Sequence, residues 1–201
     1  MSVNLLGLMA GVLAVAEHGR RGAADGGRSE KFKKKHPKGT TAYLWLTLQA
    51  FTAYSIGDAI WLGRDQEVVH DGITYLEWQP QKKGSAPVSI PMLPQLYEAT
   101  RDVKIVGPAY LLNENGRPFK SVETLRVRVQ RWCETAGIPG RSSHCVRKAV
   151  AELMAEAGAS QHQIMAVMAH TQARTSEVYT KGVQRRGLAS DGIKALSTMN
   201  W

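Results

Sequence analysis

Three short β-like runs stand together in a chain whose other periodic segments are helical. They are Glu67 to His70, Ile73 to Trp78 and Pro87 to Ile90. Asp71 and Gly72 separate the first two runs, and this pair predicts a tight hairpin because both residue types accept positive φ. Lys82, Lys83 and Gly84 lie between the second run and the third. The sequence therefore predicts a small three-stranded antiparallel sheet within a mainly helical α+β fold.

Helical patterns precede and follow the predicted sheet in the sequence. A glycine at Gly158 can end a helix in the left-handed conformation, and Ser160 with Gln163 fits a capping box that begins another. Apolar residues after Ser121 recur at helical spacing. The predicted helices are Ala42 to Phe51, Leu93 to Thr100, one from Ser121, one from Ser142 or Ser143 to Ala157, one from Ser160, and a last one from about Gly187 to Ser197.

Composition and charge narrow the class of protein. The chain has 201 residues, of which 43% are hydrophobic and 21% charged, which is close to the average of soluble globular proteins and argues against disordered, collagen-like or membrane-bundle classes. Its length predicts one domain with an appendage, or two small lobes. Twenty-six Lys and Arg against 17 Asp and Glu give a net charge of +9, which favours a polyanionic partner, most often nucleic acid. Cys133 and Cys145 are too few and too isolated for a disulfide framework or a zinc site.

The first residues differ from the rest of the chain. The apolar run from Leu5 to Ala16 is too short to span a bilayer, and no positive charge precedes it. We rank a short packing helix first for this run and a signal segment second. Residues 17–38 are rich in Gly, Lys and Arg, which predicts a flexible basic linker that is either a solvated tail or a contact to the DNA backbone.

A set of polar residues occurs along the chain in an order that suggests phosphate chemistry. His144 and Arg147 are three residues apart on one predicted helix, so they share a face and can reach one phosphate. Taken alone, this spacing is common by chance. Lys82 at the tip of the second hairpin precedes the pair, and His170 and Tyr179 follow it.

This ordered set resembles the catalytic domain of the tyrosine recombinases, the phage-integrase family. The resemblance extends from about Lys31 to Arg186 and rests on Lys35-His-Pro-Lys-Gly-Thr40, Asp71-Gly72, Gln81-Lys82-Lys83-Gly84, Asn115-Gly116-Arg117-Pro118-Phe119, His144-Cys-Val-Arg147-Lys148, Ala169-His170 and Val178-Tyr179. It implies an integrase-like catalytic domain over residues 31–201, with residues 1–30 an unassigned segment that includes the start of the basic linker. We expect residues 1–30 to hold no counterpart of the DNA-clamping helical domain that such enzymes usually carry.

The resemblance also implies a role for each residue of the set. Tyr179 is the expected nucleophile, which attacks a DNA phosphodiester and forms a 3′-phosphotyrosyl link. A phenol with a pKa of about 10 is mostly protonated at pH 7, so its proton must leave during the attack. His144 would support that transfer or orient the phosphate, His170 would bond a non-bridging oxygen, and Arg147 would neutralise the growing charge. Lys82, with Lys83 as its rival, would protonate the departing 5′ oxygen.

One position departs from the family pattern. The family's Thr-Gly-x-Arg-x-x-Asp/Glu block corresponds to Thr52 through Asp58, and Ser55 stands where the second phosphate-binding arginine is expected. Loss of one preorganised donor typically lowers a rate by about 10² to 10³. Arg64 follows nine residues later and is no obvious replacement.

Three hypotheses follow from these observations. The chain is an active site-specific recombinase, a non-cleaving relative that occupies recombination sites or pairs with another integrase, or a generic basic nucleic-acid-binding protein. The expected partner is double-stranded DNA, with self-association on it, and the expected location is the cytoplasm at the nucleoid. We expect no metal and no cofactor, because the transesterification needs neither, and we expect no membrane partner.

Overall fold

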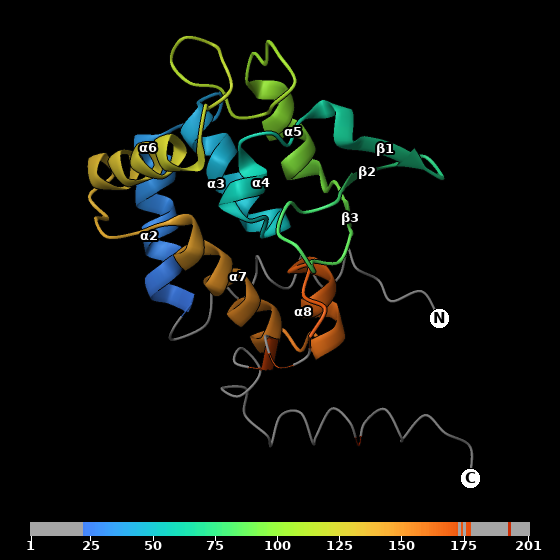
Figure 1. The fold of residues 1–201 in the computed structure, drawn as a ribbon. Helices are drawn as coiled ribbons and strands as arrows, with labels where there is room; N and C mark the ends of the chain where they lie inside the picture. The colour runs from blue at the N-terminus through green and yellow to red at the C-terminus, as the bar shows by residue number, and fades with distance from the viewer. Residues whose placement is uncertain (1–21, 173, 175, 178–192, 194–201) are drawn as a thin grey trace.

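The computed structural model describes residues 22–172, 174, 176–177 and 193. The elements are α2 (Gly22–Lys35), α3 (Thr41–Thr52), α4 (Ile56–Ala59), the 3₁₀ helix η1 (Arg64–Gln66), β1 (Glu67–His70), β2 (Ile73–Trp78), β3 (Val88–Pro91), α5 (Pro94–Asp102), α6 (Val122–Thr135), α7 (Ser143–Glu156) and α8 (Gln161–Val167). Figure 1 shows the helices grouped together and the sheet at one side of them. The predicted mainly helical α+β fold is confirmed.

The sheet is a three-stranded antiparallel meander in the order β1-β2-β3. Asp71 and Gly72 form its first turn with φ of 50° and 76°, as the Asp-Gly pair predicts. The β1–β2 hairpin extends away from the helices in Figure 1, and Val69 near its tip is 66% exposed. β3 packs beside α8, so this strand connects the sheet to the second half of the chain.

Four of the longer helices begin at a residue whose side-chain oxygen accepts the backbone N–H of the residue three positions later. The N-cap residues are Thr40 for α3, Ser121 for α6, Ser142 for α7 and Ser160 for α8. Such a cap stabilises a helix by about 1 kcal/mol, because it satisfies a donor that has no partner within the helix. The predicted helix starts at Ser121, Ser142 and Ser160 are confirmed, and Gly158 ends the α7 segment with a φ of 84°.

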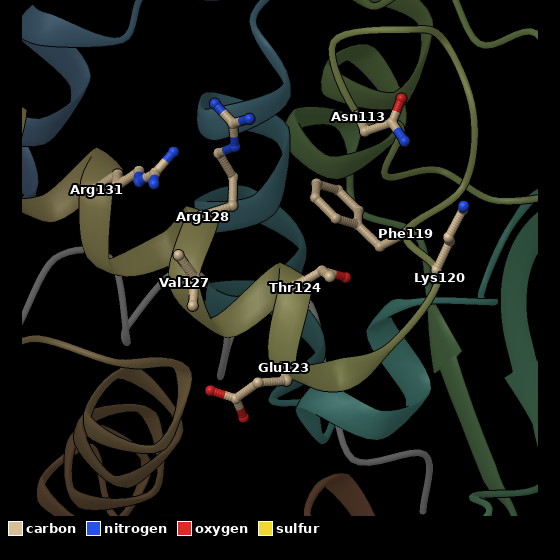
Figure 2. Close-up of a pocket in the computed structure, with 8 residues that line it drawn as sticks. All are labelled: Asn113, Phe119, Lys120, Glu123, Thr124, Val127, Arg128 and Arg131. Carbon is tan, nitrogen blue, oxygen red and sulfur yellow. The ribbon is translucent and has the colours of Figure 1, made fainter.

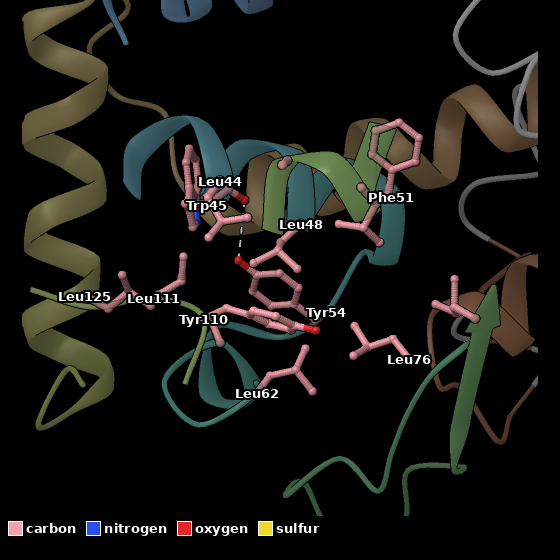
Figure 3. Close-up of a cluster of buried hydrophobic side chains, with 14 of the residues drawn as sticks. Leu44, Trp45, Leu48, Phe51, Tyr54, Leu62, Leu76, Tyr110, Leu111 and Leu125 are labelled. Atoms are coloured by element: carbon pink, nitrogen blue, oxygen red, sulfur yellow. Dashed lines mark hydrogen bonds between the residues drawn. The ribbon is translucent and has the colours of Figure 1, made fainter. Parts of the chain in front are cut away.

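The main core lies between α3 and the segments that surround it. Figure 3 shows Trp45, Leu48 and Tyr54 facing Leu76 of β2 and Tyr110. The Tyr54 hydroxyl donates to the carbonyl of Trp45 at 3.4 Å, which gives this buried hydroxyl a partner. A second, smaller cluster joins α7 to α8 and to the end of α3; its buried members are Ala53, Val150, Ala151, Met154, Ala155, Ala159, Ile164 and Met168.

The prediction of a flexible linker is wrong for residues 22–35, which form α2. Phe32 is 1% exposed, and its ring lies 5.6 Å from that of Trp45 and 4.7 Å from that of His36. His36 Nε2 also lies 3.0 Å from the carbonyl oxygen of Trp132 on α6. These apolar contacts anchor a helix whose glycines and lysines suggested a solvated segment. The predicted domain division at residues 30 and 31 falls inside α2 and stays a prediction.

Some predicted features lie outside the described residues. They are the apolar run Leu5 to Ala16, Tyr179, and the last helix from Gly187 to Ser197. Within the residues that the structure does describe, no helix is long and apolar enough to cross a bilayer.

Candidate active site

Arg147 connects two helix ends that are distant in the sequence. It lies on α7, and its guanidinium donates to the carbonyl oxygen of Ala53 and, at 2.5 Å, to that of Met168. Ala53 closes α3, and Met168 closes α8. Because the guanidinium is a planar fork of N–H donors, two carbonyls on its edge fix the orientation of the whole group.

The two carbonyls are turned toward Arg147 by left-handed backbone. Ala53 has a φ of 47°, and Ala169, which follows Met168, has a φ of 53°. A residue with a Cβ atom pays about 1 kcal/mol or more in this conformation, and such strain persists where the surrounding structure holds it. Here the buried cluster of α7 and α8 packs around Ala53. The fold therefore holds two strained turns at the point where the arginine is bound.

His170 follows the second of these turns. Its Nδ1 atom lies 2.8 Å from the hydroxyl oxygen of Ser176. Burial, together with the smaller effect of the positive charges of Arg147 and Lys82, lowers the pKa of His170 to about 4. The ring is therefore uncharged at neutral pH, and it lies within electrostatic reach of both cations.

Lys82 lies on the loop between β2 and β3, and three hydrogen bonds fix this loop. The backbone N–H of Gln81 donates to Asp58 Oδ1 at 3.1 Å. On the other side of Lys82, the Thr171 hydroxyl donates to the carbonyl of Gly84 at 2.9 Å, and the N–H of Ala86 donates to the carbonyl of Ala169 at 3.2 Å. The loop is thus tied to α4 and to the His170 segment, while Lys82 itself is exposed.

Ser55 has a structural role at the position of the expected arginine. It is the N-cap of α4: its oxygen accepts the N–H of Asp58 at 3.2 Å and its hydroxyl donates to Asp58 Oδ2 at 2.7 Å. Asp58 is 2% exposed and holds Gln81 with its other oxygen. Arg64 does not supply the missing charge here, because its guanidinium donates to the carbonyl of Thr100 at 3.2 Å, at the end of α5.

The other predicted site residues in the described part of the chain are His144 and Lys83, and both are exposed. His144 is exposed in the first turn of α7, one turn before Arg147. Lys83 is exposed on the same loop as Lys82, but Lys82 is the lysine whose charge acts on His170. The structure thus brings Arg147, His170 and Lys82 together, while Tyr179 lies outside the described residues.

Sequence reasoning did not find three contacts that hold this cluster. Ser176 contacts the His170 ring, Thr171 contacts the Lys82 loop, and the backbone of Gln81 contacts Asp58. The position of Ser176 three residues before Tyr179 is the one local signal available. The other two contacts join distant parts of the chain, so no local pattern predicts them.

A model of the phage integrase family matches residues 30–185, which form most of the chain and include all the site residues above. The chain belongs to the phage integrase family. The matched range includes Lys82, Arg147 and His170, the three residues that the fold brings together.

A curated relative adds a second comparison for this phage integrase family member. The tyrosine recombinase XerC 2 of Ralstonia nicotianae (strain ATCC BAA-1114 / GMI1000) is 35% identical over 120 residues, which cover 59% of this chain and 30% of the relative. The chain thus spans under a third of the length of that relative.

Solved structures of recombinases share the fold. The XerA recombinase matches with a TM-score of 0.62 and 14% identity over 87% of this chain and 64% of that one. A lambda integrase dimer bound to a COC' core site matches with a TM-score of 0.60 and 19% identity, over 79% of this chain and 58% of that one. XerH bound to a palindromic difH substrate matches with a TM-score of 0.60 and 16% identity, over 84% and 52%. At these identities the likeness concerns the fold alone.

A groove of about 350 Å³ lies along α6, and none of the cluster residues lines it. Figure 2 shows Phe119 and Lys120 on the segment that leads into α6, with Val127, Arg128 and Arg131 on the helix itself. Its lining includes the apolar Phe119 and Val127 and three basic residues, Lys120, Arg128 and Arg131, against one acidic residue, Glu123, and this excess of positive charge suits a polyanionic partner. Across the described residues, no three His, Cys, Asp or Glu side chains gather as a metal site would require.

Proposed function

We propose that this chain cleaves and rejoins DNA strands as a site-specific recombinase, through a covalent link between DNA and Tyr179. The observation that carries the proposal is the convergence of Arg147, His170 and Lys82 from three separate segments of the fold. Two cations around a neutral imidazole suit a phosphodiester, since the transition state accumulates negative charge on its non-bridging oxygens.

The proposed step is a transesterification in which atoms and charges balance. The Tyr179 oxygen forms a bond to phosphorus and gives up its proton, and the bond from phosphorus to the 5′ oxygen breaks. Lys82 donates a proton to that oxygen, which leaves as a 5′ hydroxyl. Arg147 and His170 bond the non-bridging oxygens, and His144 assists the transfer of the tyrosine proton to solvent. Rejoining is the reverse attack by a 5′ hydroxyl, and the conserved bond energy makes ATP unnecessary.

We propose that the basic helices α2 and α6 contact DNA away from the reacting phosphate. These two helices pack against each other. The last turn of α2 contributes Lys33, Lys34 and Lys35, and the groove along α6 contributes Lys120 and Arg131. We further propose that copies of the chain assemble on DNA or pair with another integrase, in the cytoplasm at the nucleoid.

A second function has a specific observation in its favour. Ser55 is neutral, and its hydroxyl is bonded to Asp58, so the second arginine of the family pattern has no counterpart at this position. A non-cleaving relative that occupies recombination sites would keep the fold and the basic surface without this group.

The test that separates these functions is covalent trapping. A duplex from the DNA that flanks the gene of this protein, nicked near the crossover so that cleavage cannot reverse, is incubated with wild type and Tyr179→Phe. Tyr97→Phe on α5, an exposed tyrosine, is the matched control. An adduct on denaturing gels with wild type and Tyr97→Phe, and none with Tyr179→Phe, supports the recombinase. Binding without any adduct supports the non-cleaving function.

A further inference from the structure

Ser176 is a buried hydroxyl beside the imidazole of His170. Its side chain is 0% exposed, and its oxygen lies 2.8 Å from Nδ1 of the ring. A buried hydroxyl needs a hydrogen-bond partner, because leaving it without one costs about 1 to 3 kcal/mol. In the sequence, Ser176 precedes Tyr179, the proposed nucleophile, by three residues.

The chemistry of His170 depends on which ring nitrogen carries the proton. With a pKa of about 4, the ring is neutral at pH 7, and a neutral imidazole has one N–H donor and one acceptor nitrogen. Its other hydrogen bond sets which nitrogen is which. Among the described residues, Arg147 on α7 and Lys82 on the β2–β3 loop are the charged groups that act on the ring.

The type of partner at Nδ1 is informative. A carbonyl or carboxylate there can only accept, so it would fix the proton on Nδ1 and leave a lone pair on Nε2. A serine hydroxyl can donate instead. A lone pair on Nε2 would face the lone pairs of a phosphate oxygen, whereas an N–H there forms a hydrogen bond with it.

We propose that Ser176 is a positioning residue which donates its hydroxyl hydrogen to Nδ1 of His170 and holds the neutral ring with its proton on Nε2, ready to donate to a phosphate oxygen. This inference rests on the proposed function for the identity of the acceptor. The contact that it uses belongs to the free protein, so it can be tested without DNA.

The first experiment measures the tautomer directly. The full chain, labelled with ¹⁵N in its histidines, is examined at pH 7 by long-range ¹H–¹⁵N spectroscopy, and His170→Asn assigns the signals. We expect Nε2 to carry the proton in wild type and in Ser176→Thr, which keeps the hydroxyl. Ser176→Ala lowers the fraction of rings protonated on Nε2 toward the fraction found in free histidine. A proton on Nδ1 in wild type, or the same tautomer in Ser176→Ala, overturns the proposal.

The sign of a pKa change gives an independent readout. A hydroxyl that donates to Nδ1 stabilises the neutral ring, so Ser176→Ala raises the pKa of His170. A hydroxyl that accepts from Nδ1 stabilises the protonated ring more than the neutral ring, because the charged N–H is the stronger donor. Loss of such a hydroxyl lowers the pKa of His170. A histidine titration by NMR of wild type and the two variants decides between them, and a fall in Ser176→Ala contradicts the proposal.

The last experiment connects the contact to cleavage. With the nicked duplex, Ser176→Ala forms the adduct about fivefold more slowly, as for the loss of one neutral hydrogen bond. Its DNA affinity is unchanged, and Ser176→Thr restores the rate. An unchanged rate in Ser176→Ala overturns the positioning role. If wild type itself forms no adduct, the proposed function fails, while the two NMR measurements still decide the tautomer.

Discussion

Single residues of the site do structural work in addition to any chemistry. Arg147 joins the ends of α3 and α8, and Asp58 joins Ser55 to the backbone of Gln81. Each contact replaces water around a polar group by a fixed partner, which is the condition for preorganised electrostatic stabilisation. At the scale of residues, the free protein therefore already holds in position the groups that we propose bind phosphate.

The environment of His170 predicts a dependence of stability on pH. Its folded pKa of about 4 lies below the unfolded value near 6.5, so the unfolded chain binds a proton first as pH falls. The stability is complete above pH 6.5 and declines from there toward pH 4. Between pH 7 and pH 5 a shift of this size corresponds to about 2 kcal/mol of the free energy of unfolding. Because the ring is only partly buried, solvent screens its interactions, and we expect a loss of about 1 kcal/mol.

Urea unfolding at the two pH values measures this effect. We expect wild type to lose about 1 kcal/mol more than His170→Asn over that range, since the variant lacks the titrating ring. The range lies above the ordinary pKa of carboxyl groups, which limits their contribution. Equal losses in the two proteins would show that His170 titrates alike in the folded and unfolded chain.

At the scale of elements, the β2–β3 loop is the part whose position matters most. Its two sides are fixed to different segments: Gln81 to α4, and Gly84 and Ala86 to the turn around Ala169. Lys82 lies between these attachments. A hairpin loop of this length would otherwise sample many conformations, so these few contacts hold Lys82, the proposed general acid, near His170.

Loss of one attachment should open this loop. Thr171→Val removes the hydroxyl that donates to Gly84, at a cost of about 1 kcal/mol. Because proteolysis follows the population of the open form, trypsin should cut after Lys82 or Lys83 about fivefold faster in this variant. Mass spectrometry of the digest identifies the site, and Thr171→Ser serves as the matched control. Equal cleavage of all three proteins would show that the hydroxyl does not restrain the loop.

Local signals predicted most elements correctly. Asp71-Gly72 and the capping serines at Ser121, Ser142 and Ser160 act within a few residues of themselves, so their effect can be read from the sequence. α2 was missed because its glycines and lysines favour a solvated segment, and the buried contact of Phe32 with Trp45 is a tertiary one. The same limit explains the site: the order of Lys82, Arg147 and His170 could be predicted from the family resemblance, but the contacts that hold them could not.

At the scale of the whole molecule, the chain carries a net charge of +9. The packing of α2 against α6 brings some of its basic residues together. The contact of His36 with the Trp132 carbonyl brings the lysines at the end of α2 beside the helix that carries Arg128 and Arg131. A basic surface made of two helices would follow several phosphates of a duplex, which raises affinity without adding sequence preference.

The salt dependence of DNA binding tests this surface. If Lys34 and Lys35 each neutralise a phosphate, the double variant Lys34→Gln/Lys35→Gln should reduce the slope of log K against log salt by about 2, since each contact contributes about 0.9. Fluorescence anisotropy on a labelled duplex over a salt series measures the slope. Lys104→Gln, an exposed lysine after α5, should leave it unchanged. An unaltered slope in the double variant would place the DNA elsewhere.

The measurement that tests the central claim most directly is the cleavage rate of Ser55→Arg. If the free protein already holds a family site that lacks only this charge, the arginine should raise single-turnover cleavage of the nicked duplex by about 10² to 10³. Ser55→Gln, which loses the same helix cap without adding a charge, is the matched control, and Ser55→Arg/Tyr179→Phe should form no adduct. A Ser55→Arg protein that binds the duplex like wild type but cleaves it no faster would contradict the account.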